Sequence, residues 1–164
     1  MNQALSSCLS GRVDQLLAGG FVHIGVWLPG EGGLMAFHGI NPVPNEPGVY
    51  AYAVGQEVLY VGSAQRSLFR RIRHYERSKN LRTASRIREE VLRTLSSGPG
   101  VDVDVYVIMP EKGFMLNGVL PVDPVAGLEE GLIRAIKPKW NRRGSRRGDE
   151  FGEPPSQMEG SKNP

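Results

Sequence analysis

Apolar and polar residues alternate most strictly over residues 101–108, where valine occupies every second position. A period of two places these four valines on one buried face of a strand. Two further strands are predicted over 49–54 and 58–62, separated by Gly55-Gln56. Because glycine supplies the positive φ that a type II′ turn requires, these two strands are expected to form a hairpin.

The same period predicts which side chains share a face of this hairpin. Tyr50, Tyr52 and Val54 fall on one face of the first strand. Val58 and Tyr60 fall together on one face of the second strand. The hairpin therefore brings phenol side chains within reach of one another.

Apolar residues at a spacing of three or four predict three helices, over 67–78, 83–95 and 124–137. Asp123 is a plausible N-cap for the third helix, with Pro124 at its first helical position. The inward residues of the first two helices are expected to be Leu68, Ile72 and Tyr75, and Ile87, Val91 and Leu95.

Residues 1–46 are interpreted as an N-terminal extension, with an amphipathic helix over 3–18, a strand over 21–28 and a glycine- and proline-rich loop over 29–48. The helix is expected to end at Gly19-Gly20. Its apolar side would consist of Leu5, Leu9, Val13, Leu16 and Leu17.

The pattern thus predicts an α+β fold, a small three-stranded antiparallel sheet flanked by helices, over residues 47–142. Residues 143–164 contain almost no apolar side chains and are expected to be a disordered basic and polar tail. A length of 164 residues suits one domain with a proper core.

The single cysteine, Cys8, excludes an intrachain disulfide framework and a zinc cluster built on thiolates. The sequence has neither a signal-peptide pattern nor an apolar stretch near the roughly 20 residues that a membrane helix needs. A cytoplasmic protein without a membrane partner is expected.

Basic residues are concentrated in two segments. Residues 66–93 and 134–147 together hold 17 of the 20 lysines and arginines, whereas the rest of the chain has 3 basic and 14 acidic residues. Such a polarised chain has a cationic face, for which phosphate backbones are the commonest partner. The alternative to a phosphate-binding face is that these basic residues only form the solvated surface of helices.

A carboxylate lies on the apolar face of the third predicted helix. At 100° per residue, Glu129 falls within the arc of its apolar residues, whereas Glu130 falls outside, four residues from Arg134. A carboxylate in such a place is stable as a buried ion-pair partner or as a metal ligand facing a cleft. Glu130 is expected to be an exposed partner of Arg134.

The first helix carries a second polar constellation. Arg66, Arg70, His74 and Arg77 line the side opposite its apolar residues. Arg70 and His74 lie one turn apart on the same face. A guanidinium can grip phosphate oxygens and an imidazole can share a proton near neutral pH, so the pair suits a phosphodiester. A surface histidine is the ordinary alternative for His74.

Five elements in order resemble the GIY-YIG nuclease signature. Gly48-Val49-Tyr50 is followed after nine residues by Tyr60-Val61-Gly62, and Arg70 comes ten residues after the second triplet's tyrosine. Glu129 follows in Leu-Glu-x-x-Leu-Ile, and Asn141 comes twelve residues later in Lys-Pro-x-Trp-Asn. Both triplets have valine where the family name has isoleucine. The chain has no helix-hairpin-helix repeat.

The resemblance implies a phosphodiester hydrolase that uses one metal ion. Glu129 would hold Mg²⁺ or Mn²⁺, and Arg70 would offset the charge that grows on the phosphorus. Tyr60 would position the phosphate or the nucleophile. Tyr50 would orient or deprotonate the attacking water, with His74 nearby as a proton acceptor. A phenol is a poor base at neutral pH, and the sequence leaves both possibilities open.

Asn141 is interpreted as a structural member of the same site, hydrogen-bonded to the tyrosine hairpin, and Trp140 as a cap on the core. The expected partner is double-stranded DNA, which one active site per chain would cut as a homodimer or in two nicks. Candidate nucleic-acid contacts are Arg66, Arg73, Arg77, Lys139, Arg142 and Arg143.

Three functions remain in consideration. The first is a DNA endonuclease of the restriction or mobile-element kind, suggested by the ending Lys-Pro-x-Trp-Asn and the helix that carries histidine and arginine. The second is a catalytically inactive nucleic-acid-binding module of the same fold. The third is a structure-directed or RNA-directed nuclease, because nothing in the sequence detects a 2′-hydroxyl.

Overall fold

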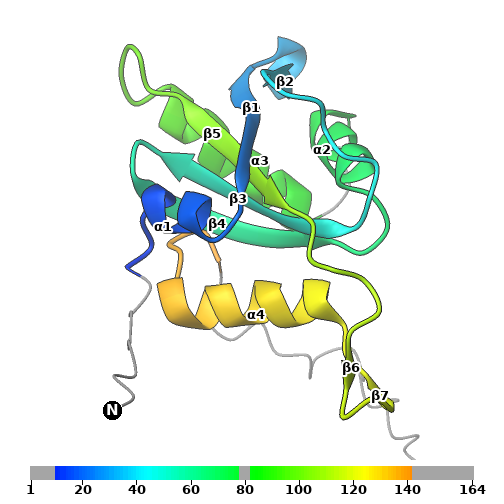
Figure 1. Cartoon of the computed structure of the whole chain (residues 1–164). Coiled ribbons are helices and arrows are strands. Elements are labelled where there is room, and N and C mark those ends of the chain that lie inside the picture. The colour runs from blue at the N-terminus through cyan, green and yellow to red at the C-terminus, as the bar shows by residue number, and fades with distance from the viewer. Residues whose placement is uncertain (1–9, 78–81, 142–164) are drawn as a thin grey trace, which may run out of the picture.

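The computed structural model describes residues 10–77 and 82–141, and these form one antiparallel sheet with helices on both faces (Figure 1). The strand order in the sheet is β2-β1-β5-β3-β4. The strands are β1 (Val22–Pro29), β2 (Met35–Gly39), β3 (Gly48–Val54), β4 (Glu57–Ala64) and β5 (Val103–Ile108). The helices are α1 (Val13–Ala18), η1 (Glu31–Gly33), α2 (Leu68–Arg77), α3 (Arg82–Leu95) and α4 (Pro124–Ile136). A separate two-stranded hairpin consists of β6 (Met115–Leu116) and β7 (Leu120–Pro121).

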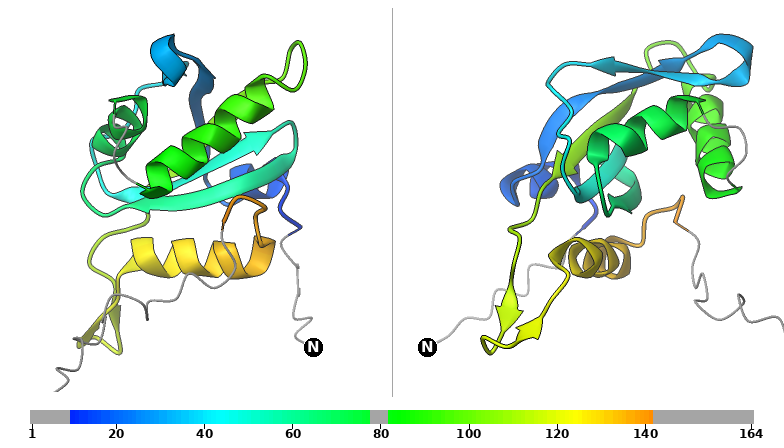
Figure 2. Two further views of the ribbon diagram at one scale, coloured as in Figure 1. Left: turned by 180° about the vertical axis from the view of Figure 1, so that it is seen from behind. Right: turned by 90° about the vertical axis from the view of Figure 1, so that its right-hand side faces the viewer.

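Each face of the sheet buries its own core. Helices α2 and α3 cover one face, and α1 and α4 cover the other (Figure 2). The first core includes Trp27, the tyrosines of the hairpin and Trp140, which is buried as expected for a cap. The second core is built on the small and branched residues of β3 and β4. Because β3 is buried on both faces, its sequence is almost entirely apolar.

The predicted three-stranded sheet is too small, because β1 and β2 extend it to five strands. Strand β1 pairs with β5, with Trp27 opposite Val103, and β2 pairs with β1. The predicted strand over 21–28 is confirmed as β1, whereas the predicted loop over 29–48 is wrong at β2. A Cβ at Gly25 would lie 2.3 Å from the His38 carbonyl oxygen, so the close approach of β1 and β2 requires glycine there.

The predicted strand over 49–54 and the Gly55-Gln56 turn are confirmed, with Gly55 at φ +56°. The predicted faces of β4 are wrong at Val58. Tyr52 pairs with Tyr60 but Ala53 pairs with Val58, so Leu59 is an extra residue in β4. Because of this bulge, the side chain of Val58 packs in the second core, whereas that of Tyr60 packs in the first.

The predicted helices over 67–78, 83–95 and 124–137 are confirmed with small changes at their ends, whereas the predicted helix over 3–18 is helical in the described residues only over Val13–Ala18. The expected inward residues of α2 are buried, and Asp123 caps α4 by accepting hydrogen bonds from the amides of Val125 and Ala126. Leu17 is exposed, contrary to expectation, and α1 packs through Val13 and Leu16. Leu5, Leu9 and residues 143–164 lie outside the described residues. None of the described helices is long and apolar enough to cross a membrane.

Both glycines of the two triplets are required by close contacts. A Cβ at Gly48 would lie 2.5 Å from the carbonyl oxygen of Ile108 and 2.7 Å from a methyl carbon of Leu68. A Cβ at Gly62 would lie 2.6 Å from the hydroxyl oxygen of Tyr50. The absence of a side chain at Gly62 therefore lets the Tyr50 phenol lie directly against β4.

Replacing Gly62 by alanine should destabilise the protein by about 1–3 kcal/mol, because the new methyl group overlaps the Tyr50 ring in a packed core. Urea denaturation followed by circular dichroism measures this change. Gly127→Ala is the matched control, since a Cβ there meets no atom within 4 Å. Equal stability of the two variants would contradict the proposed contact.

Candidate active site

Four of the candidate residues lie on or contact residues 60–63 of β4, the edge strand of the sheet: Tyr50, Tyr60, Glu129 and Asn141. No strand among the described residues pairs with the outer edge of β4. Gly11 accepts a hydrogen bond from the Val58 amide and Arg12 forms an isolated bridge with Glu57, and the segment after α4 covers the edge further along. The amide of Trp140 donates to the carbonyl of Leu59 at 2.8 Å. Asn141 accepts from the Val61 amide at 2.9 Å and donates to the Val61 carbonyl at 2.8 Å. The expected hydrogen bonding of Asn141 to the tyrosine hairpin is therefore confirmed.

Glu129 reaches the same strand from α4. It is half-buried, and its Oε2 accepts a hydrogen bond of 2.5 Å from the hydroxyl of Ser63. The ion pairs of the described residues do not include Glu129, so the structure does not support a buried ion-pair partner. Glu130 is exposed and pairs with Arg134 at 2.8 Å, as predicted.

The two triplet tyrosines belong to a buried cluster of aromatic rings. The hydroxyls of Tyr50 and Tyr75 are hydrogen-bonded at 3.0 Å. The ring centroids of Tyr50 and Tyr60 are 6.0 Å apart, and those of Tyr52 and Tyr60 are 5.5 Å apart. Trp27 packs against Tyr52 edge-on. Tyr50 and Glu129 thus approach β4 at the adjacent residues 62 and 63, from opposite faces of the sheet.

Burial keeps these phenols neutral. Loss of hydration raises the pKa of Tyr50 well above its ordinary value, and the nearby phenols of Tyr75 and Tyr60 raise it further. Burial likewise raises the pKa of Tyr75, as does the nearby Tyr60, and the hydrogen bond with Tyr50 and the charge of Arg71 oppose this rise. A catalytic base at Tyr50 would need a lowered pKa, whereas this environment raises the pKa of Tyr50.

Arg70 and His74 come from α2, which follows β4 after a short connection. The hydroxyl of Ser67 accepts from the Arg70 amide at 3.1 Å and so caps the start of the helix. The Arg70 side chain is exposed, and no described contact joins it to Glu129. His74 is half-buried, and its Nε2 is buried without a hydrogen-bond partner among the described residues. It is not an ordinary surface histidine.

The candidate nucleic-acid contacts differ in their surroundings. Arg66 and Arg77 are exposed. Arg73 pairs with Glu76 at 3.1 Å, and its guanidinium lies 5.4 Å from the centre of the Phe69 ring. Lys139 pairs with a glutamate of β4, Glu57. Exposed pairs of this kind contribute little to stability, so these cations remain available to phosphate. Arg142 and Arg143 lie outside the described residues.

Two members of the site were missed in the sequence. Ser63 holds the Glu129 carboxylate, and its only sequence signal is that it directly follows the second triplet. Tyr75 was predicted to point inward but not to bind Tyr50. Both contacts join residues from distant parts of the chain, which local periodicity does not detect.

Within residues 10–77 and 82–141, no group of three or more histidine, cysteine, aspartate or glutamate side chains is placed to hold a metal ion. Glu129 is thus a lone carboxylate. Its Oε2 is bonded to Ser63, and its other oxygen has no partner in the described chain.

Comparisons with known proteins agree with this arrangement. No protein-family model matches the chain. The chain is 28% identical over 103 residues to the UvrABC system protein C of Nautilia profundicola, which covers 62% of this chain and 15% of that protein. The chain therefore spans a small part of the length of this curated relative.

Among solved structures, the chain is similar to a mutant of endonuclease II of bacteriophage T4, with a TM-score of 0.57, 16% identity and coverage of 80% of this chain and 99% of that one. It is also similar to the restriction endonuclease HPY188I, solved with product DNA, with a TM-score of 0.50, 17% identity and coverage of 73% and 75%. The GIY-YIG domain of UvrC from Thermotoga maritima is 28% identical and covers 62% of this chain and 88% of that one, with a TM-score of 0.39. The fold is shared with the T4 and HPY188I endonucleases. The sequence similarity to UvrABC system protein C agrees with the resemblance carried by the two triplets.

The buried tyrosines predict a loss of stability at high pH. Below about pH 10 phenols are protonated in the folded and the unfolded chain, so their contribution is fully present. Above it the unfolded chain releases protons that folded Tyr50 and Tyr75 retain, so the free energy of unfolding falls as the pH rises towards their raised pKa. The slope is at most about 1.4 kcal/mol per pH unit for each such tyrosine.

Urea denaturation of the wild type and Tyr75→Phe at several pH values tests this expectation. The variant should lose stability less steeply with pH, since one of the titrating groups is gone. The difference between the two proteins isolates the phenol from lysines that titrate in the same range. Identical slopes would show that the Tyr75 pKa is not raised in the folded state.

Proposed function

We propose that this protein is a metal-dependent endonuclease that hydrolyses phosphodiester bonds in DNA. The observation that carries the proposal is the hydrogen bond between Ser63 and Glu129 on β4, one residue beyond the glycine that supports Tyr50. A half-buried carboxylate on an apolar helix face, held by a hydroxyl beside the second triplet, has a role in chemistry that a binding module does not need.

Glu129 is the proposed ligand of a divalent ion, Mg²⁺ or Mn²⁺. The donor set fits such an ion, because a hard oxygen ligand with one unpartnered carboxylate oxygen suits a cation that keeps several waters. Ser63 fixes the orientation of the carboxylate by occupying its other oxygen. The ion would supply charge stabilisation to the phosphate and the leaving oxygen when bound.

The other residues are assigned roles that agree with their surroundings. Tyr50 keeps its proton, because burial disfavours its anion, and from the first core it supports β4 and the neighbouring Tyr60. His74 is then the acceptor of the water's proton. Arg70 offsets the charge that grows on the phosphate, for which an exposed guanidinium is free to move onto the substrate. Tyr60 positions the phosphate or the nucleophile.

DNA is the proposed substrate because the chain concentrates its basic residues around α2 and α3 and near its end. The two solved structures of the same fold are nucleases, one of them solved with product DNA. Cleavage of both strands by one active site per chain would require a homodimer or two successive nicks. We propose the cytoplasm as the compartment and restriction or mobile-element biology as the context.

Replacing Glu129 by glutamine should lower the rate of Mg²⁺-dependent nicking of supercoiled plasmid by roughly a thousandfold, or about 4 kcal/mol. Glu130→Gln is the matched control, since that carboxylate only pairs with Arg134 on the surface. EDTA should abolish cleavage by the wild type. Equal nicking by wild type and Glu129→Gln would refute the metal assignment. Binding without cleavage across DNA and RNA substrates would favour the inactive module.

Tyr50→Phe should lower kcat by about tenfold to a hundredfold while leaving the acidic limb of the pH–rate profile in place, because the phenol acts with its proton attached. His74→Gln should remove that limb. Plasmid nicking over a range of pH values distinguishes the two. Disappearance of the limb in Tyr50→Phe would assign the base to the tyrosine instead.

A further inference from the structure

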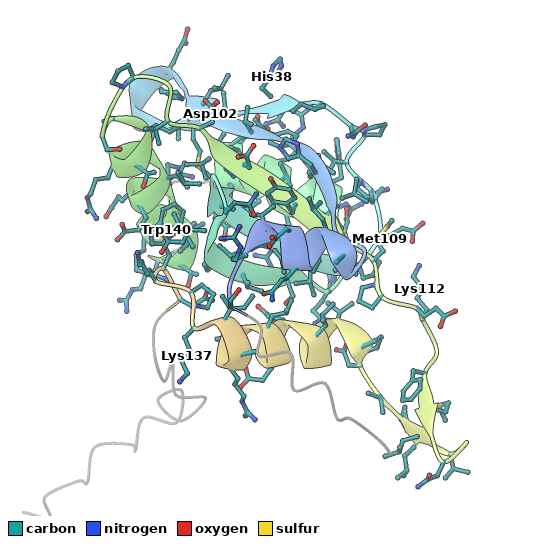
Figure 3. All side chains as sticks on the ribbon, turned by 60° about the vertical axis from the view of Figure 1, so that its left-hand side comes forward. His38, Asp102, Met109, Lys112, Lys137 and Trp140 are labelled. Atoms are coloured by element: carbon teal, nitrogen blue, oxygen red, sulfur yellow. The ribbon has the colours of Figure 1, made fainter. Side chains whose placement is uncertain are left out.

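Residues 114–122, which we name the apolar hairpin, project from the body of the molecule between β5 and α4 (Figures 1 and 2). Its strands β6 and β7 pair only with each other. Figure 3 shows the chain leaving the body at Met109 and passing Lys112 before it enters the hairpin. An isolated two-stranded hairpin is at best marginally stable in water, so this one needs a partner surface.

Apolar side chains of the hairpin face solvent. Seven of the twelve large apolar residues that are exposed in the described chain lie between residues 109 and 122, and Val119 is 70% exposed. These seven are Met109, Phe114, Met115, Leu116, Val119, Leu120 and Val122. A contiguous apolar surface of this kind on a small domain marks an interaction site.

The charges around the hairpin disfavour nucleic acid as its partner. Residues 114–122 contain no charged side chain. On either side lie Glu111, Asp123 and Lys112, and the Lys112 ammonium is already paired with Glu46 at 3.5 Å. A phosphate backbone would meet one cation here, Lys112, beside the carboxylates of Glu111 and Asp123, whereas the chain's basic segments lie elsewhere in the sequence.

The same charge distribution favours a second copy of this chain. With 17 of 20 basic residues in two segments, two copies repel each other through their cationic faces. The apolar hairpin carries no charged side chain, so two copies can meet there without opposing like charges. The free edges of β6 and β7 also leave backbone groups available for pairing between copies.

We propose that the apolar hairpins of two chains pack against each other about a two-fold axis and form a homodimer. The contact is isologous, with Leu116, Val119 and Leu120 of each chain at its centre. It buries the exposed apolar surface and supplies the partner that a lone hairpin lacks. The proposal extends the proposed function, since the dimer would carry two active sites for the two strands of a duplex, but the assembly itself does not depend on catalysis.

Sedimentation or light scattering of the full chain over a wide range of protein concentrations tests the assembly. The wild type should be a dimer, and Leu116→Glu with Val119→Glu should be a monomer, because two buried carboxylates oppose association. Ile40→Glu is the matched control, since Ile40 is 57% exposed in a loop far from the hairpin in sequence. It should remain a dimer.

Cross-linking provides a second measurement that does not depend on how the charged variant folds. Val119→Cys should yield a cross-linked dimer with a short bis-maleimide, whereas the wild type, which has only Cys8, should not. A wild type that is monomeric at all concentrations would overturn the proposal, and so would a charged variant that remains a dimer. Loss of DNA affinity in a charged variant of an already monomeric protein would assign the hairpin to nucleic acid instead.

Plasmid cleavage separates this proposal from the nuclease assignment. The charged hairpin variant should still nick supercoiled plasmid but lose most of the linear product that a dimer generates. If neither the wild type nor the charged hairpin variant cuts DNA, while the wild type is a dimer and the variant a monomer, the nuclease assignment is wrong and the dimer proposal holds.

Discussion

The outer edge of β4 is the constraint on which the candidate site depends. An edge strand exposes amides and carbonyls that must find partners, and here the Asn141 side chain binds both backbone groups of Val61. The same contact ties the end of the described chain to its middle. The backbone groups of Val61 are thereby satisfied, and α4, which carries Glu129, is held at Ser63 and followed by a segment that is held at Val61.

Because Gly62 has no side chain, the tyrosine cluster and the Glu129 carboxylate can both contact the same short stretch of β4. Gly62 lets Tyr50 contact β4 from the first core, and the next residue, Ser63, turns towards α4 and binds Glu129. Because successive side chains of a strand point to opposite faces, one short stretch of β4 can organise both cores. The arrangement also buries the phenols, and burial in turn favours their neutral form.

The surface divides into regions of different chemistry. Arginines on α2 and α3 form the cationic side that suits phosphate, and several of them are held by weak surface pairs or are unpaired among the described residues. The apolar hairpin is neutral and lies within the connection from β5 to α4, where it projects away from α2 and α3 (Figures 1 and 2). Contacts with nucleic acid and contacts with a second chain can therefore occur at separate places on one small domain.

The sequence by itself determined the tyrosine hairpin, the helices, the cap at Asp123 and the set of residues that resemble a nuclease, because each depends on local periodicity or fixed spacing. It also predicted that Glu129 differs from Glu130, since a helix has a known period. Only the tertiary structure decided that β1 and β2 join the sheet, that Leu59 forms a bulge and that Ser63 holds Glu129. These features arise from pairing and close approach between segments far apart in the chain, and such contacts leave no periodic signal.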